Sequence, residues 1–544
     1  MIHDPYPMIK RFLNRQSHTI TGAAIIIGAA SFVSRIIGML RDRLFAHHFG
    51  AGDVMDAYYA AFKIPDLVYN LLIVGALSAG FIPVFVELLT KDKKQAWRVT
   101  NAVINILGIL LVIVCGIFVI FTPGLMRLLV PGFEGEKFEM TVTLTRIMFL
   151  SPILLGISSV ISGVLQSFRA FLVYSLTPIM YNLGIIIGIT ILVPMFGIRG
   201  LAYGVILGAL LHLIIQVPSL IQNGFRYQAL FLWKDKYVRK IGALMIPRTL
   251  GMATRQINFL VITIIASTLA SGSIAIFSFA DNLQSVPSGI VGVSFGIAIF
   301  PTLARLAAHG NHKKMSKRIA DTTRQILFLI IPLTIIFLLL RAQIVRVVLG
   351  TGEFDWNATV LVANALAFFS ISLFAQSLIP LLARSFYALQ DTWTPLVIGL
   401  ISAGANIGAA IYLSGIYGIT GLVAGYSFSM VLQMALLWIL LHFKLGYLHE
   451  KKIIITLLKI SIAAFFMALS IQLLKYPIAQ IVDMQKFWGI LIQGALSGTI
   501  GLLVYGFICN QLKLREMRLF QESLKKRWLK LRNVPGEVHD ADRV

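Results

Sequence analysis

Charged side chains stand inside two apolar stretches near the start of this sequence, where a charge without a partner would be costly. Arg35, Arg41 and Asp42 fall in the first stretch, and Lys63 and Asp66 fall in the second. An ionised side chain at the centre of a lipid bilayer costs roughly 2.5 to 3.5 kcal/mol even on a lenient insertion scale. Such residues normally face a polar cavity, and their excess of positive charge would suit an anionic ligand.

The spacing of these charges recurs later in the chain. Arg35 and Asp42 are seven residues apart, which places them on one face of a helix. Arg248 and Arg255 have the same spacing in a later apolar stretch. Guanidinium groups keep their charge and bind phosphate oxygens in pairs, so these three arginines and Arg41 would form an anion site if they faced one cavity. The alternative is that Arg41 and Asp42 only pair with each other at a helix end.

The other polar residues give weaker signals. Lys63 and Asp66 are three residues apart and can simply pair with each other, and Asp281 and Asn282 stand at the repeat position of Lys63. The sequence contains no Walker A motif, nucleophile elbow or HExxH zinc motif. It therefore indicates a transporter rather than an enzyme, with no cofactor and no metal site.

The composition places the chain among α-helical proteins that cross a membrane many times. Of its 544 residues, 58% are hydrophobic and only 13% are charged, as is typical of this class. Hydropathy predicts an all-α polytopic fold with fourteen transmembrane helices. The predicted spans lie near residues 20–40, 64–89, 100–122, 141–166, 173–195, 200–221, 242–269, 274–304, 319–341, 358–383, 394–414, 417–442, 453–475 and 487–510.

The positive charge is unevenly distributed between alternate loops. The net charge is +24, and most of the 47 lysines and arginines fall in the termini and in loops such as 91–98 and 305–318. The positive-inside rule then predicts a multi-pass protein of the inner (cytoplasmic) membrane with both termini in the cytoplasm. The basic loops and tail would meet anionic phospholipid, and nucleic acid is not an expected partner.

The chain also repeats itself. The segment FGIRGLAYG at 196–204 recurs as YGITGLVAG at 417–425, and SFRA at 167–170 recurs as SFYA at 385–388. We infer two parallel six-helix repeats around a central cavity, related by an axis along the membrane normal because each holds an even number of spans. The predicted regions are a cytoplasmic N-terminus (1–19), an N-terminal lobe (20–222), an amphipathic linker (223–241), a C-terminal lobe (242–442), an extra helix pair (453–510) and a basic cytoplasmic tail (511–544).

Several short motifs in this sequence are characteristic of one family. They are Ser34-Arg35-x-x-Gly38-x-x-Arg41-Asp42, Asp56-Ala57, Ala61-Phe62-Lys63-x-Pro65, Ala270-Ser271-Gly272-Ser273 and Ala280-Asp281. These motifs resemble those of the MurJ (MviN) family of lipid II flippases. The resemblance covers nearly the whole chain and implies a member of the superfamily of multidrug, oligosaccharidyl-lipid and polysaccharide exporters. It implies that lipid II, the undecaprenyl-pyrophosphate-linked disaccharide-pentapeptide, is moved from the inner to the outer leaflet for peptidoglycan synthesis. The movement would use alternating access without ATP.

The resemblance assigns cavity roles to four residues and shows where this chain departs from the family. Arg35, Arg41, Asp42 and Lys63 match substrate-binding positions of the first two helices. Where many members carry arginines, this chain has Tyr69 and Asn70 in the second helix and Asn282 in the eighth. We expect Arg248 and Arg255 to supply the missing charge, with Asn282 still lining the site.

The energy source for transport and the identity of the transported molecule are the last two expectations from the sequence. No Asp or Glu lies between Thr392 and Lys444, so a sodium site in the eleventh and twelfth helices would have only neutral oxygens. We expect the membrane potential, or an ion gradient, to act on the cavity charges, at ~2.3 kcal/mol per charge per 100 mV. The main alternative is export of another lipid-linked oligosaccharide or of drugs, and the cell wall synthesis machinery is an expected partner.

Overall fold

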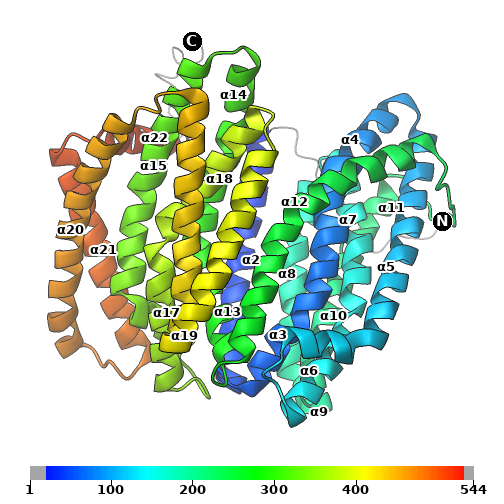
Figure 1. Cartoon of the computed structure of the whole chain (residues 1–544), viewed down its shortest axis with the longest axis horizontal. Helices are drawn as coiled ribbons and strands as arrows, with labels where there is room; N and C mark the ends of the chain where they lie inside the picture. Colours follow the sequence, from blue (N-terminus) through cyan, green and yellow to red (C-terminus); the bar gives the residue numbers. More distant parts are fainter. Residues whose placement is uncertain (1–19, 532–544) are drawn as a thin grey trace. The chain divides into compact units, whose positions relative to one another are not determined.

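The computed structural model describes the backbone of residues 20–531, and Figure 1 shows that its regular elements are helices throughout this range. Side chains are described over the same range, apart from residues 20–25, 74–79, 246–255, 524 and 526–531. The predicted all-α fold is thus confirmed.

The helices before the linker carry the first repeat. They are α2 (Ile20–Phe49), α3 (Asp53–Tyr69), η1 (Asn70–Val74), α4 (Gly75–Lys91), α5 (Lys93–Leu129), α6 (Gly135–Met148), α7 (Leu150–Ser167), α8 (Phe171–Ile187), η2 (Gly188–Leu192), α9 (Val193–Phe196), α10 (Arg199–Ile214) and α11 (Val217–Gln222), where η marks a π-helical segment. Asp92 begins α5 as an N-cap, because its carboxylate accepts hydrogen bonds from the backbone nitrogens of Lys94 (2.8 Å) and Gln95 (3.1 Å).

The helices after the linker carry the second repeat and the extra pair. They are α12 (Lys236–Ser267), α13 (Ser273–Ser288), η3 (Gly289–Val293), α14 (Ser294–Ala308), α15 (His312–Leu339), α16 (Arg341–Val348), α17 (Trp356–Ile371), α18 (Leu373–Ala388), α19 (Trp393–Leu445), α20 (Glu450–Ile481), α21 (Phe487–Gln511) and α22 (Arg515–Leu531). Asp235 caps α12 in the same manner, accepting from the backbone nitrogen of Tyr237 at 2.8 Å.

Nine of the described helices are long and apolar enough to cross a membrane, and the bent pair α17 and α18 raises this number to ten. One of the nine, α19, covers two of the predicted spans. The predicted second span is divided among α3, η1 and α4, and none of these pieces reaches the required length alone. The many-span architecture is therefore confirmed, and the count of fourteen stays a prediction.

The internal repeat is visible in two helical hairpins. The backbone breaks at Gly197 (φ 60°, ψ −151°) and at Gly418 (φ 58°, ψ −135°), two positions 221 residues apart that require a positive φ. Beyond each break the chain returns along itself: a Cβ on Gly200 would collide with the backbone of Leu192, and one on Gly421 would collide with that of Leu413. The same glycines thus permit the same close helix contact in both repeats.

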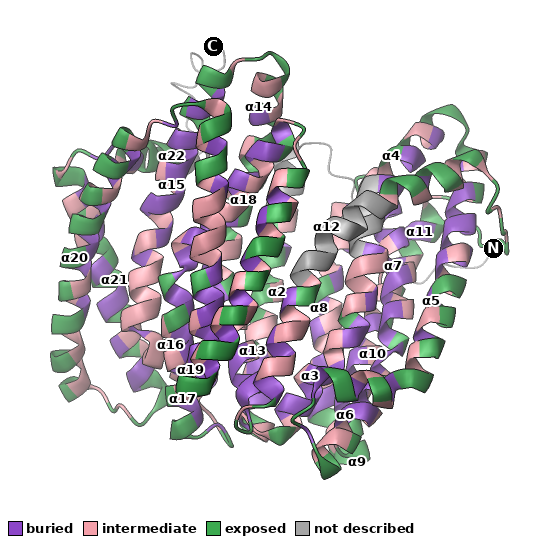
Figure 2. Cartoon of the chain, viewed as in Figure 1, coloured by how far each residue is buried: buried purple, intermediate pink, exposed green. Residues whose placement is uncertain are grey.

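Close contacts divide the chain into two compact units. Unit 1 holds the described residues up to Phe279 together with Val348–Val362 and Ala403–Gly425, and unit 2 holds the remainder. Within unit 2, α20 packs along α21 and α15. Figure 2 shows many exposed residues along α20, and these include the apolar Ile462, Phe465 and Leu473. A helix with this exposed apolar surface is suited to contact lipid.

Candidate functional site

A charged cluster joins the first and fifth helices of the first repeat. Arg41 of α2 donates from Nε and Nη2 to Asp42 Oδ1 at 3.0 and 2.8 Å, and its Nη1 atom donates to Asn182 Oδ1 of α8 at 2.9 Å. Asp42 is 7% exposed, whereas the Arg41 side chain keeps 21% of its surface. Arg41 and Asp42 therefore do pair, as the alternative interpretation had it, but the guanidinium also binds a second helix and stays partly accessible.

Two further predicted site residues, Arg35 and Lys63, lie on the first two helices, α2 and α3. Arg35 is exposed, nearly two turns before Arg41 on α2. Lys63 of α3 places its Nζ atom 5.7 Å from the ring centre of Phe259 on α12, a cation–π contact. Because α3 belongs to the first repeat and α12 to the second, this contact links the two repeats.

The residues that replace the expected family arginines are used locally. The Tyr69 hydroxyl lies 3.2 Å from Ser159 Oγ, and the Asn70 side chain donates to the backbone carbonyl of Asp66 at 2.8 Å. Neither can supply positive charge to a ligand. Between residues 63 and 70, which begin the predicted second span, the charged residues are thus Lys63 and Asp66.

The membership of three predicted residues in the site around Arg41 stays a prediction. The side chains of Arg248 and Arg255 lie outside the described residues, so their proposed replacement of the family arginines stays a prediction. Asn282 lies on α13 in unit 2, whereas Arg41 and Lys63 belong to unit 1.

A neutral amide pair, which we did not predict, joins the first and fifth helices of the second repeat. The Asn406 side chain of α19 donates from Nδ2 to Asn258 Oδ1 of α12 at 2.7 Å. Asn406 is 1% exposed and Asn258 is 8% exposed. Asparagines within apolar spans were the available signal, because a buried amide in a membrane helix requires a hydrogen-bond partner.

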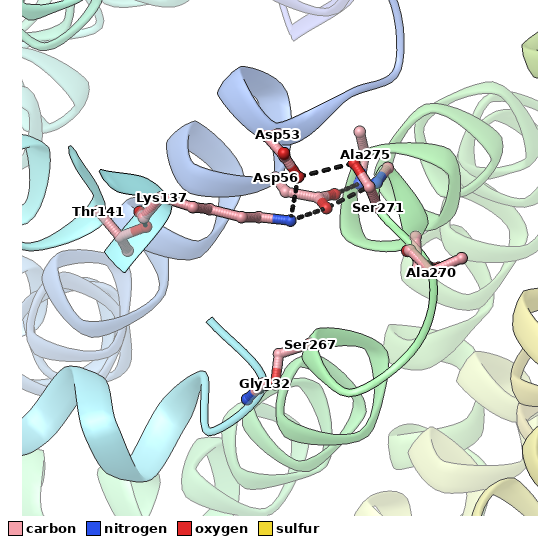
Figure 3. A network of polar contacts seen from close by, with 11 residues as sticks. Asp53, Asp56, Gly132, Lys137, Thr141, Ser267, Ala270, Ser271 and Ala275 are labelled. Carbon is pink, nitrogen blue, oxygen red and sulfur yellow. Dashed lines mark hydrogen bonds and ion pairs between the residues drawn. The ribbon is translucent and has the colours of Figure 1, made fainter. Parts of the chain in front are cut away.

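A second polar cluster, the Asp56 network, lies where the α12–α13 loop meets the start of α3 (Figure 3). Asp56 is 1% exposed, and its carboxylate accepts from Lys137 Nζ of α6 at 2.8 Å. It also accepts from the backbone nitrogens of Gly272 (2.7 Å) and Ala275 (2.9 Å). These three bonds hold a buried charge by an ion pair and backbone donors, as such a charge requires.

Asp53 extends this network by one helical turn. It accepts from Ser271 Oγ and pairs with Lys137 Nζ, both at 2.6 Å. These hydrogen bonds, that of Lys137 first, hold the pKa of the Asp53 carboxyl below its usual range. The Asp56 network therefore consists of Asp53, Asp56, Lys137, Ser271, Gly272 and Ala275, and it ties α3 and α6 of the first repeat to α13 of the second.

Two glycines show how closely these loops approach each other. Gly272 has a φ of +86°, and a Cβ at this position would overlap the carbonyl oxygen of Ala51. A Cβ on Gly132 would overlap the backbone of Ser267, which also accepts from the Gly132 nitrogen through its hydroxyl at 3.5 Å. At both contacts, backbone therefore packs directly on backbone. The sequence motifs that contain Asp56 and Ser271 indicated two parts of this network, but no motif in the sequence indicated Lys137.

Two repeated sets of apolar helices, each with a polar contact inside it and joined to each other by the Asp56 network, are the features of a membrane protein with many spans and an internal repeat. A solved inward-facing MATE family multidrug transporter has this fold, with a TM-score of 0.65 and 16% identity over 78% of this chain and 99% of that one. A solved structure described as lipid II flippase MurJ in an inward closed conformation has a TM-score of 0.73, with 24% identity over 90% of this chain and all of that one.

The sequence comparisons identify the family. The family model described as lipid II flippase MurJ matches residues 45–490. A probable lipid II flippase MurJ of Vibrio cholerae is 30% identical over 90% of this chain and 95% of its own length. One of Haemophilus influenzae is 31% identical over 81% of this chain and 90% of its own length. The chain belongs to the MurJ family of lipid II flippases, as its motifs indicated.

Proposed function

We propose that this protein moves lipid II from the inner to the outer leaflet of the cytoplasmic membrane for cell wall synthesis. The family match over residues 45–490 carries the proposal. The substrate bears a diphosphate, and the partly exposed guanidinium of Arg41, with the exposed Arg35 on the same helix, offers fixed positive charge to it. Arg248, Arg255, Lys63 and Asn282 are proposed to complete the site.

The Asp56 network supports alternating access as the mechanism. It connects helices of both repeats through bonds that a modest movement of α13 would break, and a transporter must close one end of its cavity while the other is open. With both termini in the cytoplasm, this network stands at the outer side of the membrane. Lipid II would then enter from the inner side while the network is intact and leave outward once it is broken.

No cofactor is needed for this cycle, and we propose that the membrane potential or an ion gradient drives it. The basic loops and the tail helix α22 would rest on anionic phospholipid, and the cell wall synthesis machinery would receive the product.

The tail helix α22 packs against α15. The ring centres of Phe520 in α22 and Phe328 in α15 are 6.2 Å apart, and this contact holds the first turns of the tail against α15.

Complementation tests the function. A bacterium depleted of its own lipid II flippase should grow and expose lipid II on its outer leaflet when this chain is expressed. Arg35→Ala should abolish this rescue at equal protein levels. Absence of rescue by the wild-type chain, despite verified membrane insertion, would contradict the proposal and favour export of another lipid-linked oligosaccharide or of drugs.

Cysteine labelling tests the closure. The two native cysteines, Cys115 and Cys509, are buried, so Ser267→Cys, at a 4% exposed position, can be followed with a maleimide reagent that does not cross membranes. Labelling should be slow in the parent and several-fold faster when Asp56→Asn is added. Asp92→Asn, which alters only a helix cap, is the matched control. Equal labelling rates with and without Asp56→Asn would show that the network does not hold this end closed.

A further inference from the structure

Arg384 places a guanidinium group between two helices of unit 2 and leaves one of its nitrogens unsatisfied. The residue lies near the end of α18, which packs against α14. Its Nη1 atom is buried and has no hydrogen-bond partner among the described residues. A buried guanidinium nitrogen without an acceptor is unfavourable, so this arrangement calls for an explanation.

Gly296 of α14 provides the space that this group occupies. A Cβ at Gly296 would overlap Nη1 of Arg384 and would lie 3.3 Å from Pro380. Any larger residue would therefore push the guanidinium out from between the helices. The glycine acts as a notch that admits the positive charge.

The carboxylate nearest to Arg384 in sequence on the C-terminal side is already occupied. Asp391 accepts from Lys444 Nζ at 2.6 Å and from Thr394 Oγ1 at 2.7 Å. Arg384 forms no ion pair within the described part of the chain. The Nη1 atom itself is buried, but Arg384 as a residue is only partly buried, so an anion from outside the protein can approach the charge from the part of the side chain that stays accessible.

The surface beside Arg384 is apolar and exposed. Val293, Ile297 and Phe300 are 41%, 58% and 37% exposed, and Val293 and Phe300 share the helix face of Gly296. Tyr387, one turn beyond Arg384 on α18, is 45% exposed. A cation that binds phosphate in pairs of bonds, next to exposed aliphatic and aromatic side chains, matches a phosphate head with a hydrocarbon chain attached.

We propose that Arg384 binds the phosphate group of a membrane lipid, with Gly296 as the notch and the exposed face of α14 as the surface for the lipid chain. By the predicted topology the site lies at the cytoplasmic side. The proposal does not depend on lipid II being the transported molecule, because a phospholipid and an undecaprenyl lipid present the same chemical group.

Native mass spectrometry of the purified full-length protein tests the site. Phosphatidylglycerol, undecaprenyl diphosphate and, as a lipid without phosphate, diacylglycerol are titrated separately. Arg384→Gln should weaken binding of at least one phosphate lipid by about tenfold, as the loss of a charge-assisted hydrogen bond requires, and should leave diacylglycerol unchanged. Arg341→Gln is the matched control, because it changes another arginine of unit 2, one whose Nη1 atom already donates to the backbone carbonyl of Leu338 at 2.8 Å; this variant should bind as the wild type does.

The outcomes separate the sources of the phosphate. Loss confined to undecaprenyl diphosphate assigns the site to the transported class of lipid, loss confined to phosphatidylglycerol assigns it to a resident phospholipid, and loss of both assigns a general phosphate site. Unchanged binding of both lipids by a folded Arg384→Gln variant overturns the proposal. If that variant does not fold, Arg384→Lys decides: it keeps the charge but not the paired donors, and wild-type binding by it would equally overturn the proposal.

Discussion

The two repeats join their first and fifth helices in different ways. In the first repeat, Arg41 of α2 reaches Asn182 of α8 while paired with Asp42. In the second, Asn258 of α12 bonds to Asn406 of α19, and both side chains are neutral amides. An anionic ligand can compete with Asp42 for a partly exposed guanidinium, whereas a buried amide pair offers it nothing comparable. Both repeats therefore have a polar contact between their first and fifth helices, but only the contact of the first repeat is charged.

The largest expected effect follows from removing the charged contact. Arg41→Ala takes the cation from a mostly buried carboxylate and should lower the free energy of unfolding by about 3 kcal/mol. It should also abolish flipping. Thermal unfolding in detergent and outer-leaflet lipid II measure the two effects. Wild-type stability in this variant would mean that Arg41, through its ion pair with Asp42 and its hydrogen bond to Asn182, does not stabilise the packing of α2 on α8.

The helical hairpins at Gly197 and Gly418 should lose similar amounts of stability when a glycine at the close contact is replaced in either repeat. Gly200→Ala and Gly421→Ala each force a Cβ into a neighbouring backbone, and each should cost roughly 1 to 3 kcal/mol through overpacking. Gly404→Ala is the control, because a Cβ there meets nothing within 4 Å. Melting temperatures compare the three variants, and a large loss in only one hairpin would break the structural equivalence of the repeats.

A smaller effect is expected from the neutral contact. Asn406→Ala removes one amide of a buried pair and should cost about 1 to 2 kcal/mol. Flipping should continue at the temperatures where the variant stays folded. If Asn406→Ala abolished flipping without loss of stability, the contrast between a charged functional contact and a neutral structural one would be wrong.

The smallest change in stability is expected when the first repeat is made to resemble the second. In the double variant Arg41→Gln, Asp42→Asn both charges are replaced by neutral amides and no buried charge is left unpaired, so stability should change by no more than about 1 kcal/mol. Flipping should be lost all the same, because the phosphate would lose its cation. The comparison of growth rescue with the melting temperature isolates the role of charge from that of packing.

The sequence predicted the parts of this molecule that depend on local composition. Apolar stretches such as 487–510 coincide with single helices because hydropathy alone specifies them. The adjacency of Arg41 and Asp42 suggested their pairing. Asn182 could not be foreseen as the third member, because it lies 141 residues away. Lys137 was missed for another reason: it stands in a polar segment with several charges, where a lysine looks like an ordinary surface residue.

The π-helical segments show something about the history of the chain. η1 begins at Asn70 and η3 begins at Gly289, so the two lie 219 residues apart, at the same place in the second helix of each repeat. A π-helical segment corresponds to one residue inserted into an α-helix. A single insertion before the gene segment was duplicated accounts for both, whereas an insertion after duplication would have to occur twice at one position. The equal position of the two segments thus favours an irregular turn that is older than the two-lobed protein.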